Sequence, residues 1–316
     1  MERLSFDIYP NPPFRLDLTS WCLRRREENR IDLWDGRVHR RVFLLDDAPS
    51  LVSVTDLGRV EAPHLRIDAV ATALSDTAAS TLRDALVRTF GIGEDLAPLY
   101  RFARHEPVLG PLVARYRGMR PPRFPTLFET LLNGFACQQV SLAACLHLLD
   151  RLAEAWGRDT STLHPGIRIL PLPEDLSNLD AEALRGIGFS RQKSRYIVGL
   201  ARQLEGNPLA LSHLSSMTDE AARTFLQQLP GIGRWTADYV LLRGLGRWHV
   251  FPAGDAGARG KLGNWLATGV SLDDAAVQRL IDSWQPFGGL VYFHLLLWDL
   301  EQRGLIQAFL PRTAGP

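Results

Sequence analysis

The chain has almost no net charge, few cysteines and no long hydrophobic run. Its 36 basic residues nearly balance 35 acidic ones, so no global positive field indicates a histone-like protein, although a local phosphate-binding surface is compatible with this balance. No stretch approaches the roughly 20 apolar residues that cross a bilayer, and residues 1–7 lack the apolar core of a signal peptide. We therefore expect no membrane partner.

The sequence contains only three cysteines, Cys22, Cys137 and Cys145. Their odd number and scattered spacing favour reduced thiols in a cytosolic-type compartment, so we expect a cytoplasmic protein. No CxxC pair is present, and we expect no metal site.

The length and composition are those of an ordinary globular protein. Of 316 residues, 46% are hydrophobic and 22% are charged, which is enough material for two domains. We predict an α+β fold, in which a mixed α/β N-terminal domain with an antiparallel sheet, residues 1–105, precedes an all-α domain, residues 106–316.

Short runs rich in valine, leucine, isoleucine and phenylalanine alternate with turn residues in the N-terminal third. Such a pattern predicts an antiparallel meander. A helix over 76–90 should follow, with Ser75 as its N-cap and Gly91 as its stop. The three predicted strands are 37–45, 51–57 and 64–70.

Beyond residue 106 the hydrophobic spacing becomes helical. One apolar stripe ends before residues 138–140, which we expect to form an exposed turn, and Ser141 can cap the next helix. The stripe consists of Phe128, Leu131, Leu132 and Phe135.

A short glycine motif occurs twice, as LRGIG at 184–188 and as LPGIG at 229–233. Each copy precedes a helical pattern, which predicts two helix–hairpin–helix turns. In the second copy, Gly231 and Gly233 project no Cβ, so the backbone can approach a phosphate at the N-terminus of the helix over about 235–242. The alternative is a helix C-cap with no ligand.

The second motif and the loop after it resemble one family. LPGIGRWTA at 229–237, followed by VFPAGD at 250–255, is similar to the helix–hairpin–helix (HhH-GPD) DNA glycosylase superfamily, and most like its bacterial 3-methyladenine DNA glycosylase II branch. PPF at 12–14, WCL at 21–23 and QQVS at 138–141 extend the resemblance over most of the chain.

This resemblance implies an enzyme of base excision repair that excises damaged bases from double-stranded DNA, as a monomer associated with the nucleoid. Asp255 takes the place of the catalytic carboxylate, which stabilises the positive charge that develops on the sugar. Without the family, an aspartate in a glycine-rich loop is usually a turn former, but the offset of Asp255 from the hairpin favours the catalytic role. Asp238 is expected to be structural. The residues implied to hold the DNA backbone are Gly231, Ile232, Gly233, Arg234 and Thr236.

Trp235 separates two reaction types within the family. Enzymes that also nick the strand carry a lysine there, which forms a Schiff base, so Trp235 implies a monofunctional enzyme with water as nucleophile. No cysteine lies beyond Cys145, and we expect no iron–sulfur cluster. The only cofactor that the resemblance allows is a monovalent cation at the hairpin.

The implied base pocket and wedge depart from the best-known pattern. Gln139 takes the wedge position in place of a leucine, and a solvated glutamine is the alternative. Trp235 and Tyr239 can stack an extruded base, with core packing as the alternative. Trp21 and Cys22 should supply the N-terminal side of the pocket. The family pattern places aromatic pocket residues at the positions of Ala256 and Leu296, and Phe293 or Trp298 can take their place. Arg259 and Lys261, which flank the hairpin and the aspartate loop, can contact phosphates.

Two other functions remain as hypotheses. A non-enzymatic module that docks on duplex DNA would need neither Asp255 nor a pocket. A bifunctional glycosylase/lyase for oxidised purines shares this domain order, but Trp235 argues against it. Because no general acid for the departing base follows from the sequence, we expect cationic alkylpurines such as 3-methyladenine or 7-methylguanine, which leave without a proton.

Overall fold

The computed structural model describes residues 1–267 and 272–307. Its architecture, an antiparallel sheet followed by many helices, confirms the predicted α+β class. The strands are β1 (Glu2–Ile8), β2 (Leu33–Trp34), β3 (Val38–Leu45), β4 (Ala48–Asp56) and β5 (Leu65–Ala71). The helices are α1 (Leu16–Arg24), α2 (Ala78–Phe90), α3 (Ala97–Ala103), α4 (Leu109–Arg115), α5 (Leu127–Cys137), α6 (Leu142–Trp156), α7 (Pro173–Ser177), α8 (Ala181–Gly186), α9 (Arg191–Gly206), α10 (Asp219–Gln227), α11 (Arg234–Arg243), α12 (Ala256–Trp265), α13 (Asp274–Ser283) and α14 (Gly288–Gln302), with a 3₁₀ turn at Ser212–Ser216.

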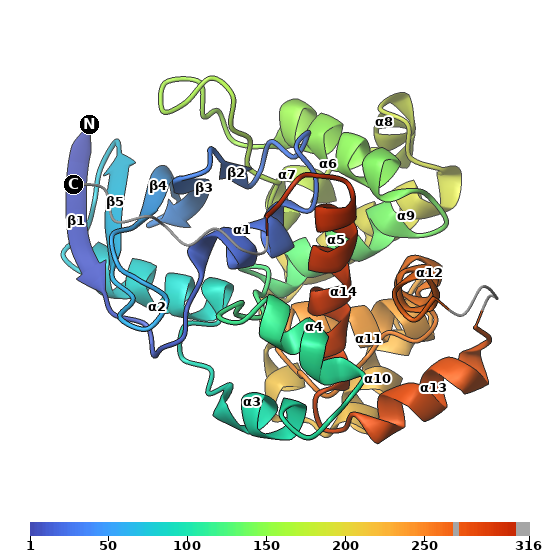
Figure 1. Ribbon diagram of the computed structural model, residues 1–316. Helices are drawn as coiled ribbons and strands as arrows, with labels where there is room; N and C mark the ends of the chain where they lie inside the picture. Colours follow the sequence, from blue (N-terminus) through green and yellow to red (C-terminus); the bar gives the residue numbers. More distant parts are fainter. Residues whose placement is uncertain (268–271, 308–316) are drawn as a thin grey trace.

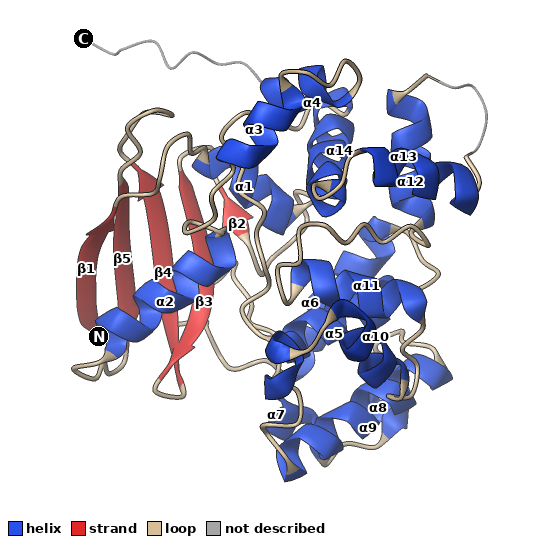
Figure 2. Ribbon diagram, turned by 90° about the horizontal axis from the view of Figure 1, so that it is seen from below, coloured by secondary structure: helices blue, strands red, loops and turns tan. Residues whose placement is uncertain are grey.

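The sheet lies at one side of the molecule, and α2 crosses one of its faces (Figures 1 and 2). Its strand order is β1-β5-β4-β3-β2, with every neighbouring pair antiparallel. Alternate residues of β5 are buried, as the two-residue period of a strand requires. Ile67 belongs to the same hydrophobic cluster as Leu82, Leu86 and Phe90 of α2, so this face is covered by the helix.

The three strands predicted from the sequence correspond to β3, β4 and β5, whereas β1 and β2 were not predicted. β1 pairs with β5 along its whole length and places Phe6 beside Ile67. β2 is a two-residue strand that pairs with β3. β1 depends on a partner distant in sequence and β2 is very short, which explains why no local pattern predicted them.

The predicted start of α2 is wrong, while its end is confirmed. The helix begins at Ala78, with Thr77 in the N-cap position and no side-chain cap. Ser75 accepts from Ala78 N–H at 3.1 Å through its backbone carbonyl and not through its side chain. Gly91 ends the helix with a φ of +60°, a left-handed conformation that glycine adopts without a Cβ penalty.

Two hydrophobic clusters organise the helical part. The first joins α5, α6, α9, α10 and α11. The second joins α12, α13 and α14 with α1, α3 and α4. Helix α11 belongs to both, because Val240 and Leu241 pack in the first cluster and Leu242 packs in the second. The helix that follows the hairpin is therefore fixed from both sides.

The second cluster extends across the predicted boundary at residue 105. It contains Trp21 and Cys22 of α1 together with Leu109 of α4, and α1 packs against α14. The division into residues 1–105 and 106–316 therefore stays a prediction.

In the described part of the chain, no helix is long and apolar enough to span a bilayer.

Candidate active site at the hairpin and the Asp255 loop

The turn between α10 and α11 has the geometry of a phosphate seat. Gly231 has a φ of +85°, and a Cβ there would overlap the Tyr196 ring, so only glycine fits. Gly233 is exposed, and a Cβ there would meet nothing within 4 Å. The first intrahelical bond runs from Ala237 N–H to the Gly233 carbonyl, so the amides of the preceding helical residues are free of helix partners.

Two of the five predicted backbone-contact residues face inward instead. Ile232 is 5% exposed and packs in the first cluster. Thr236 is 1% exposed, and its hydroxyl accepts a 3.0 Å hydrogen bond from Gln138 Nε2. Their side chains hold the hairpin against the protein, so a contact of these two residues with DNA would come from the backbone. Gly231, Gly233, the exposed Arg234 and the backbone amide of Thr236 remain as candidates.

We expect Gly233→Val to weaken duplex binding on the order of 10- to 100-fold regardless of sequence, since amide contacts to phosphate are lost. The open space at Gly233 should keep the loss of stability below about 1 kcal/mol. Fluorescence anisotropy with lesion-free duplexes measures the affinity. Gly186→Val, at the equally open glycine of the first motif, is the matched control; equal weakening by both variants would contradict the assignment.

Buried side chains and a backbone hydrogen bond hold the loop from Val250 to Asp255, the candidate catalytic residue. Phe251 and Pro252 are buried, and Asp255 N–H donates to the Pro252 carbonyl at 2.8 Å. Asp255 is the N-cap of α12: its Oδ1 accepts from Ala258 N–H at 2.9 Å. No donor within residues 1–267 and 272–307 bonds to Oδ2, and the residue is half-buried, so one carboxylate oxygen is free to act.

The aromatic residues predicted for the pocket do lie together. Trp235 and Tyr239 stack with ring centroids 5.6 Å apart. Gly254 of the aspartate loop packs close to Trp235, since a Cβ placed on this glycine would lie 3.4 Å from the Trp235 Cβ. Trp235 is half-buried, and its indole N–H has no acceptor among the described residues. Tyr239 is 2% exposed, and its ring centroid lies 6.3 Å from that of Phe124. Trp235 thus forms the accessible ring, with Tyr239 beneath it.

Tyr292 on α14 is a site residue that the sequence did not reveal. Burial, together with the nearby Asp255 carboxylate, raises the pKa of its phenol well above the ordinary value, so it is a neutral O–H donor at physiological pH. Of the predicted substitutes, Phe293 is fully buried against Trp248 and Tyr292, and Trp298 packs on the second cluster. The aromatic group next to Asp255 is therefore Tyr292.

Trp21 and Cys22 do not line an open cleft, which corrects that part of the prediction. Cys22 is fully buried, and burial raises the pKa of its thiol to about 12 even though Arg243 opposes the shift. Trp21 is 8% exposed and packs in the same cluster. Arg25, at the C-cap of α1, is also buried, and its guanidinium donates to Asn133.

The wedge position is exposed, as predicted, and it is held from two sides. Gln139 has a φ of +55°. Its neighbour Gln138 donates to the Gly231 carbonyl at 2.9 Å, and the Gln138 carbonyl accepts from Lys193 Nζ at 2.7 Å. Ser141 caps α6 by accepting from Ala144 N–H, which confirms that prediction. The wedge loop (residues 138–141) is thus anchored to the second glycine motif and to the helix that follows the first.

The expectation of three reduced thiols is wrong for two of them. Cys137 and Cys145 form a disulfide with a Cα–Cα distance of 4.7 Å, and Cys22 is free. Because the wedge loop reverses the chain, the last residue of α5 lies beside the first turn of α6. Spacing alone could not predict this pairing, since it depends on how the two helices meet.

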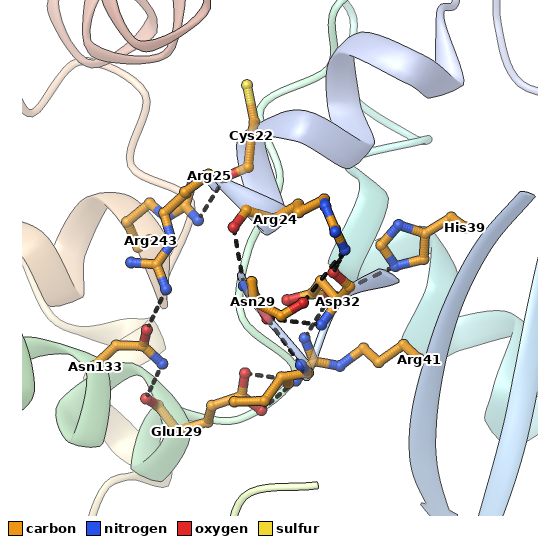
Figure 3. A network of polar contacts seen from close by, with 11 residues as sticks. Cys22, Arg24, Arg25, Asn29, Asp32, His39, Arg41, Glu129, Asn133 and Arg243 are labelled. Carbon is orange, nitrogen blue, oxygen red and sulfur yellow. Dashed lines mark hydrogen bonds and ion pairs between the residues drawn. The ribbon is translucent and has the colours of Figure 1, made fainter. Parts of the chain in front are cut away.

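A buried polar network joins the sheet to α5 (Figure 3). Arg41 of β3 donates to Asp32 at 2.8 Å and to Glu129 at 2.5 Å. Although burial alone would raise it, Arg41 and His39 hold the pKa of Asp32 far below its ordinary value. One turn after Glu129, Asn133 accepts from Arg25 at 2.7 Å. The sheet thereby fixes the helix that carries the wedge loop.

The remaining charged candidates are partly engaged within the protein. Asp238 is 5% exposed and pairs with Arg223 at 2.6 Å, so it is structural, as expected. Arg259 pairs with Asp274, and Lys261 donates weakly to the Gly257 carbonyl at 3.4 Å. In the part of the chain that the structure describes, no cluster of three His, Cys, Asp or Glu side chains can hold a metal.

A family profile matches the segment that contains this arrangement. The profile described as "HhH-GPD superfamily base excision DNA repair protein" matches residues 134–286, the segment that carries both the hairpin and Asp255. The part of the chain that carries the candidate site is thus similar to this superfamily.

Two relatives of known name are similar to part of the chain. The chain is 33% identical to the DNA-3-methyladenine glycosylase of Bacillus subtilis (strain 168) over 53% of its own length and 55% of the relative. It is 28% identical to DNA-3-methyladenine glycosylase 2 of Escherichia coli (strain K12) over 61% and 64%, respectively. The alignments thus span less than two thirds of the length of these curated relatives.

One solved structure matches almost the whole chain. The 3-methyladenine DNA-glycosylase from Archaeoglobus fulgidus superposes with a TM-score of 0.81 at 25% identity, covering 93% of this chain and 98% of that one. The similarity therefore includes the N-terminal sheet as well as the helical part.

Proposed function

We propose that this protein is a monofunctional DNA glycosylase that extrudes alkylated, positively charged purines from double-stranded DNA and hydrolyses their N-glycosidic bond. The observation that carries the proposal is Asp255. One of its carboxylate oxygens is fixed by α12, and the other has no donor among the described residues. The preceding residue, Gly254, packs against Trp235, which stacks on Tyr239.

The chemistry follows from the charge that develops on the sugar. As the bond between C1′ and the base nitrogen breaks, its electron pair leaves with the base, and the sugar acquires oxocarbenium character, which the Asp255 carboxylate stabilises. Water then forms the new bond to C1′, and its proton passes to the carboxylate and to solvent. A cationic alkylpurine departs as a neutral molecule, so this step needs no acid.

The hairpin would hold the duplex while the lesion is out of the stack. Gly233 and the first amides of α11 would contact phosphate, and Gln139 would fill the gap left by the base. A monovalent cation at the hairpin stays a proposal: the Gly231 carbonyl already accepts from Gln138, so an ion would share that oxygen. We further propose that the protein acts as a monomer in the compartment that holds the DNA.

The direct test is release of free bases from methylated duplex DNA, separated by chromatography. We expect 7-methylguanine and 3-methyladenine in the soluble fraction. Binding of the duplex without any released base would favour the docking module instead.

Borohydride should trap no covalent complex between the protein and DNA. Trp235 replaces the lysine that lyases use, and the chain has only two lysines, Lys193 and Lys261. Lys193 is bound to the Ala136 and Gln138 carbonyls. Trapped adduct, measured by gel shift, would contradict the monofunctional assignment, and its loss in Lys261→Ala would identify the amine one turn into α12.

A further inference from the structure

A disulfide encloses the wedge loop in a covalent ring. Cys137 is the last residue of α5, and Cys145 lies in the first turn of α6. The two cysteines are eight positions apart, and their Cα atoms are separated by 4.7 Å. Gln139 and Val140, both exposed, lie between them. The bond therefore joins the two helix ends that carry the wedge loop.

The hydrogen bonds at this loop hold its first residue and not its tip. Gln138 is fixed to the second glycine motif and to Lys193. The next side chain, that of Gln139, forms no hydrogen bond within residues 1–267 and 272–307, and Val140 is 40% exposed. Ser141 caps α6 but bonds only within its own helix. The tip of the loop therefore depends for its position on the ring that the disulfide closes.

Solvent reaches one of the two bonded cysteines. Cys137 is half-buried, whereas Cys145 is 0% exposed. A small thiolate can thus attack the Cys137 sulfur, with the Cys145 thiolate as the leaving group. The third cysteine, Cys22, is fully buried, and burial raises the pKa of its thiol to about 12. It is therefore not a competing nucleophile.

The fold does not need this disulfide for support. Helix α5 packs against α6, and Phe135 and Leu149 of these helices belong to the first hydrophobic cluster. Disulfides support small domains that lack such a core, whereas those of proteins in reducing compartments are usually transient and sense redox conditions. The position of this bond, at the functional loop, fits the second role.

We propose that Cys137 and Cys145 form a redox modification site, at which a low-molecular-weight thiol opens the disulfide and releases the wedge loop. The oxidised protein, the form that the structure shows, holds Gln139 in place for base extrusion, and the reduced protein does not. The inference rests on the proposed glycosylase function and adds regulation to it.

The exchange balances with small thiols alone. The first thiolate attacks Cys137 Sγ and forms a mixed disulfide, and the displaced Cys145 thiolate takes a proton from solvent. A second thiolate attacks the small-molecule sulfur of that mixed disulfide and releases Cys137, which is then protonated. Two electrons pass to the protein, and the two small thiols become one disulfide. An excess of the small disulfide reverses both steps.

Reduction should slow base extrusion rather than bond cleavage, because Asp255 lies outside the ring. A mobile wedge side chain must be ordered when the base leaves the stack, and we expect 7-methylguanine release from a fully paired duplex to slow about 3- to 10-fold. A mismatched lesion is extruded more easily. Its release should therefore change by less than about twofold.

The test measures single-turnover excision by wild type before and after reduction with dithiothreitol, on duplexes with 7-methylguanine opposite cytosine or adenine. Alkylation of the folded protein, followed by mass spectrometry, should detect Cys137 only after reduction. Cys137→Ser should behave in both buffers as reduced wild type does. Cys22→Ala is the matched control: it removes the free cysteine and should keep the full difference between the buffers.

The outcomes separate the inference from its foundation. If neither redox form releases 7-methylguanine from any duplex, the proposed function fails. If reduction leaves both rates unchanged or slows both duplexes by the same factor, the disulfide does not act through the wedge loop and the inference is overturned. Alkylation of Cys137 in oxidising buffer would overturn it as well. Should Cys137→Ser not fold, the comparison of oxidised and reduced wild type still decides the question.

Discussion

Asp255→Asn should reduce the release of methylated bases by a factor on the order of 10² to 10³ or more while the protein stays folded. Removing an electrostatic stabiliser of a developing charge typically has an effect of this size. Asparagine caps a helix about as well as aspartate, so α12 keeps its bond from Ala258 N–H. The substitution therefore removes the negative charge and little else. Single-turnover excision from 7-methylguanine duplexes measures the effect.

Asp273→Asn is the matched control for this experiment. Asp273 caps α13 in the same way, by accepting from Ala276 N–H at 2.7 Å, and its side chain is exposed. It should retain full activity and the same melting temperature as wild type. If Asp255→Asn turned over as fast as this control, the protein would bind DNA without the proposed chemistry.

Arg41→Met should lower the free energy of unfolding by about 3–5 kcal/mol, the effect of breaking a buried ion pair from one side. Arg41 is the cation between the Asp32 and Glu129 carboxylates, and all three side chains are almost inaccessible to solvent. Without it, two buried negative charges have lost their main partner. Urea unfolding followed by circular dichroism measures the change.

Arg40→Met is the neighbouring control, on the opposite face of the same strand. Arg40 pairs with Asp35, and both side chains are partly exposed, so its removal should change the unfolding free energy by less than about 1 kcal/mol. If both variants lost the same unfolding free energy, the substitution would disturb the sheet itself and not the buried network. In Arg41→Met, α5 also loses its tie to β3, so weaker placement of the wedge loop is expected.

Features that depend on neighbours in sequence could be predicted from the residues alone. The hydrophobic stripe of α5 and the Ser141 cap of α6 both form as expected. The same is true of the glycine turn at Gly231 and Gly233. Each of these is determined within about one helical turn, because hydrogen bonds and φ preferences there involve residues only three or four positions apart.

Features that depend on distant partners could not be predicted in this way. The run Arg24, Arg25, Arg26 reads as a solvated charged segment, yet Arg25 is buried by a partner 108 residues away. Arg243 bonds to a carbonyl 221 residues away, and Tyr292 reaches Asp255 only because α14 packs beside α12. Local residue patterns are enough to specify the hairpin and the α+β class, whereas the resemblance to a known family singled out the Asp255 loop. Which charges surround the pocket follows from burial, and burial depends on how elements far apart in the chain pack together.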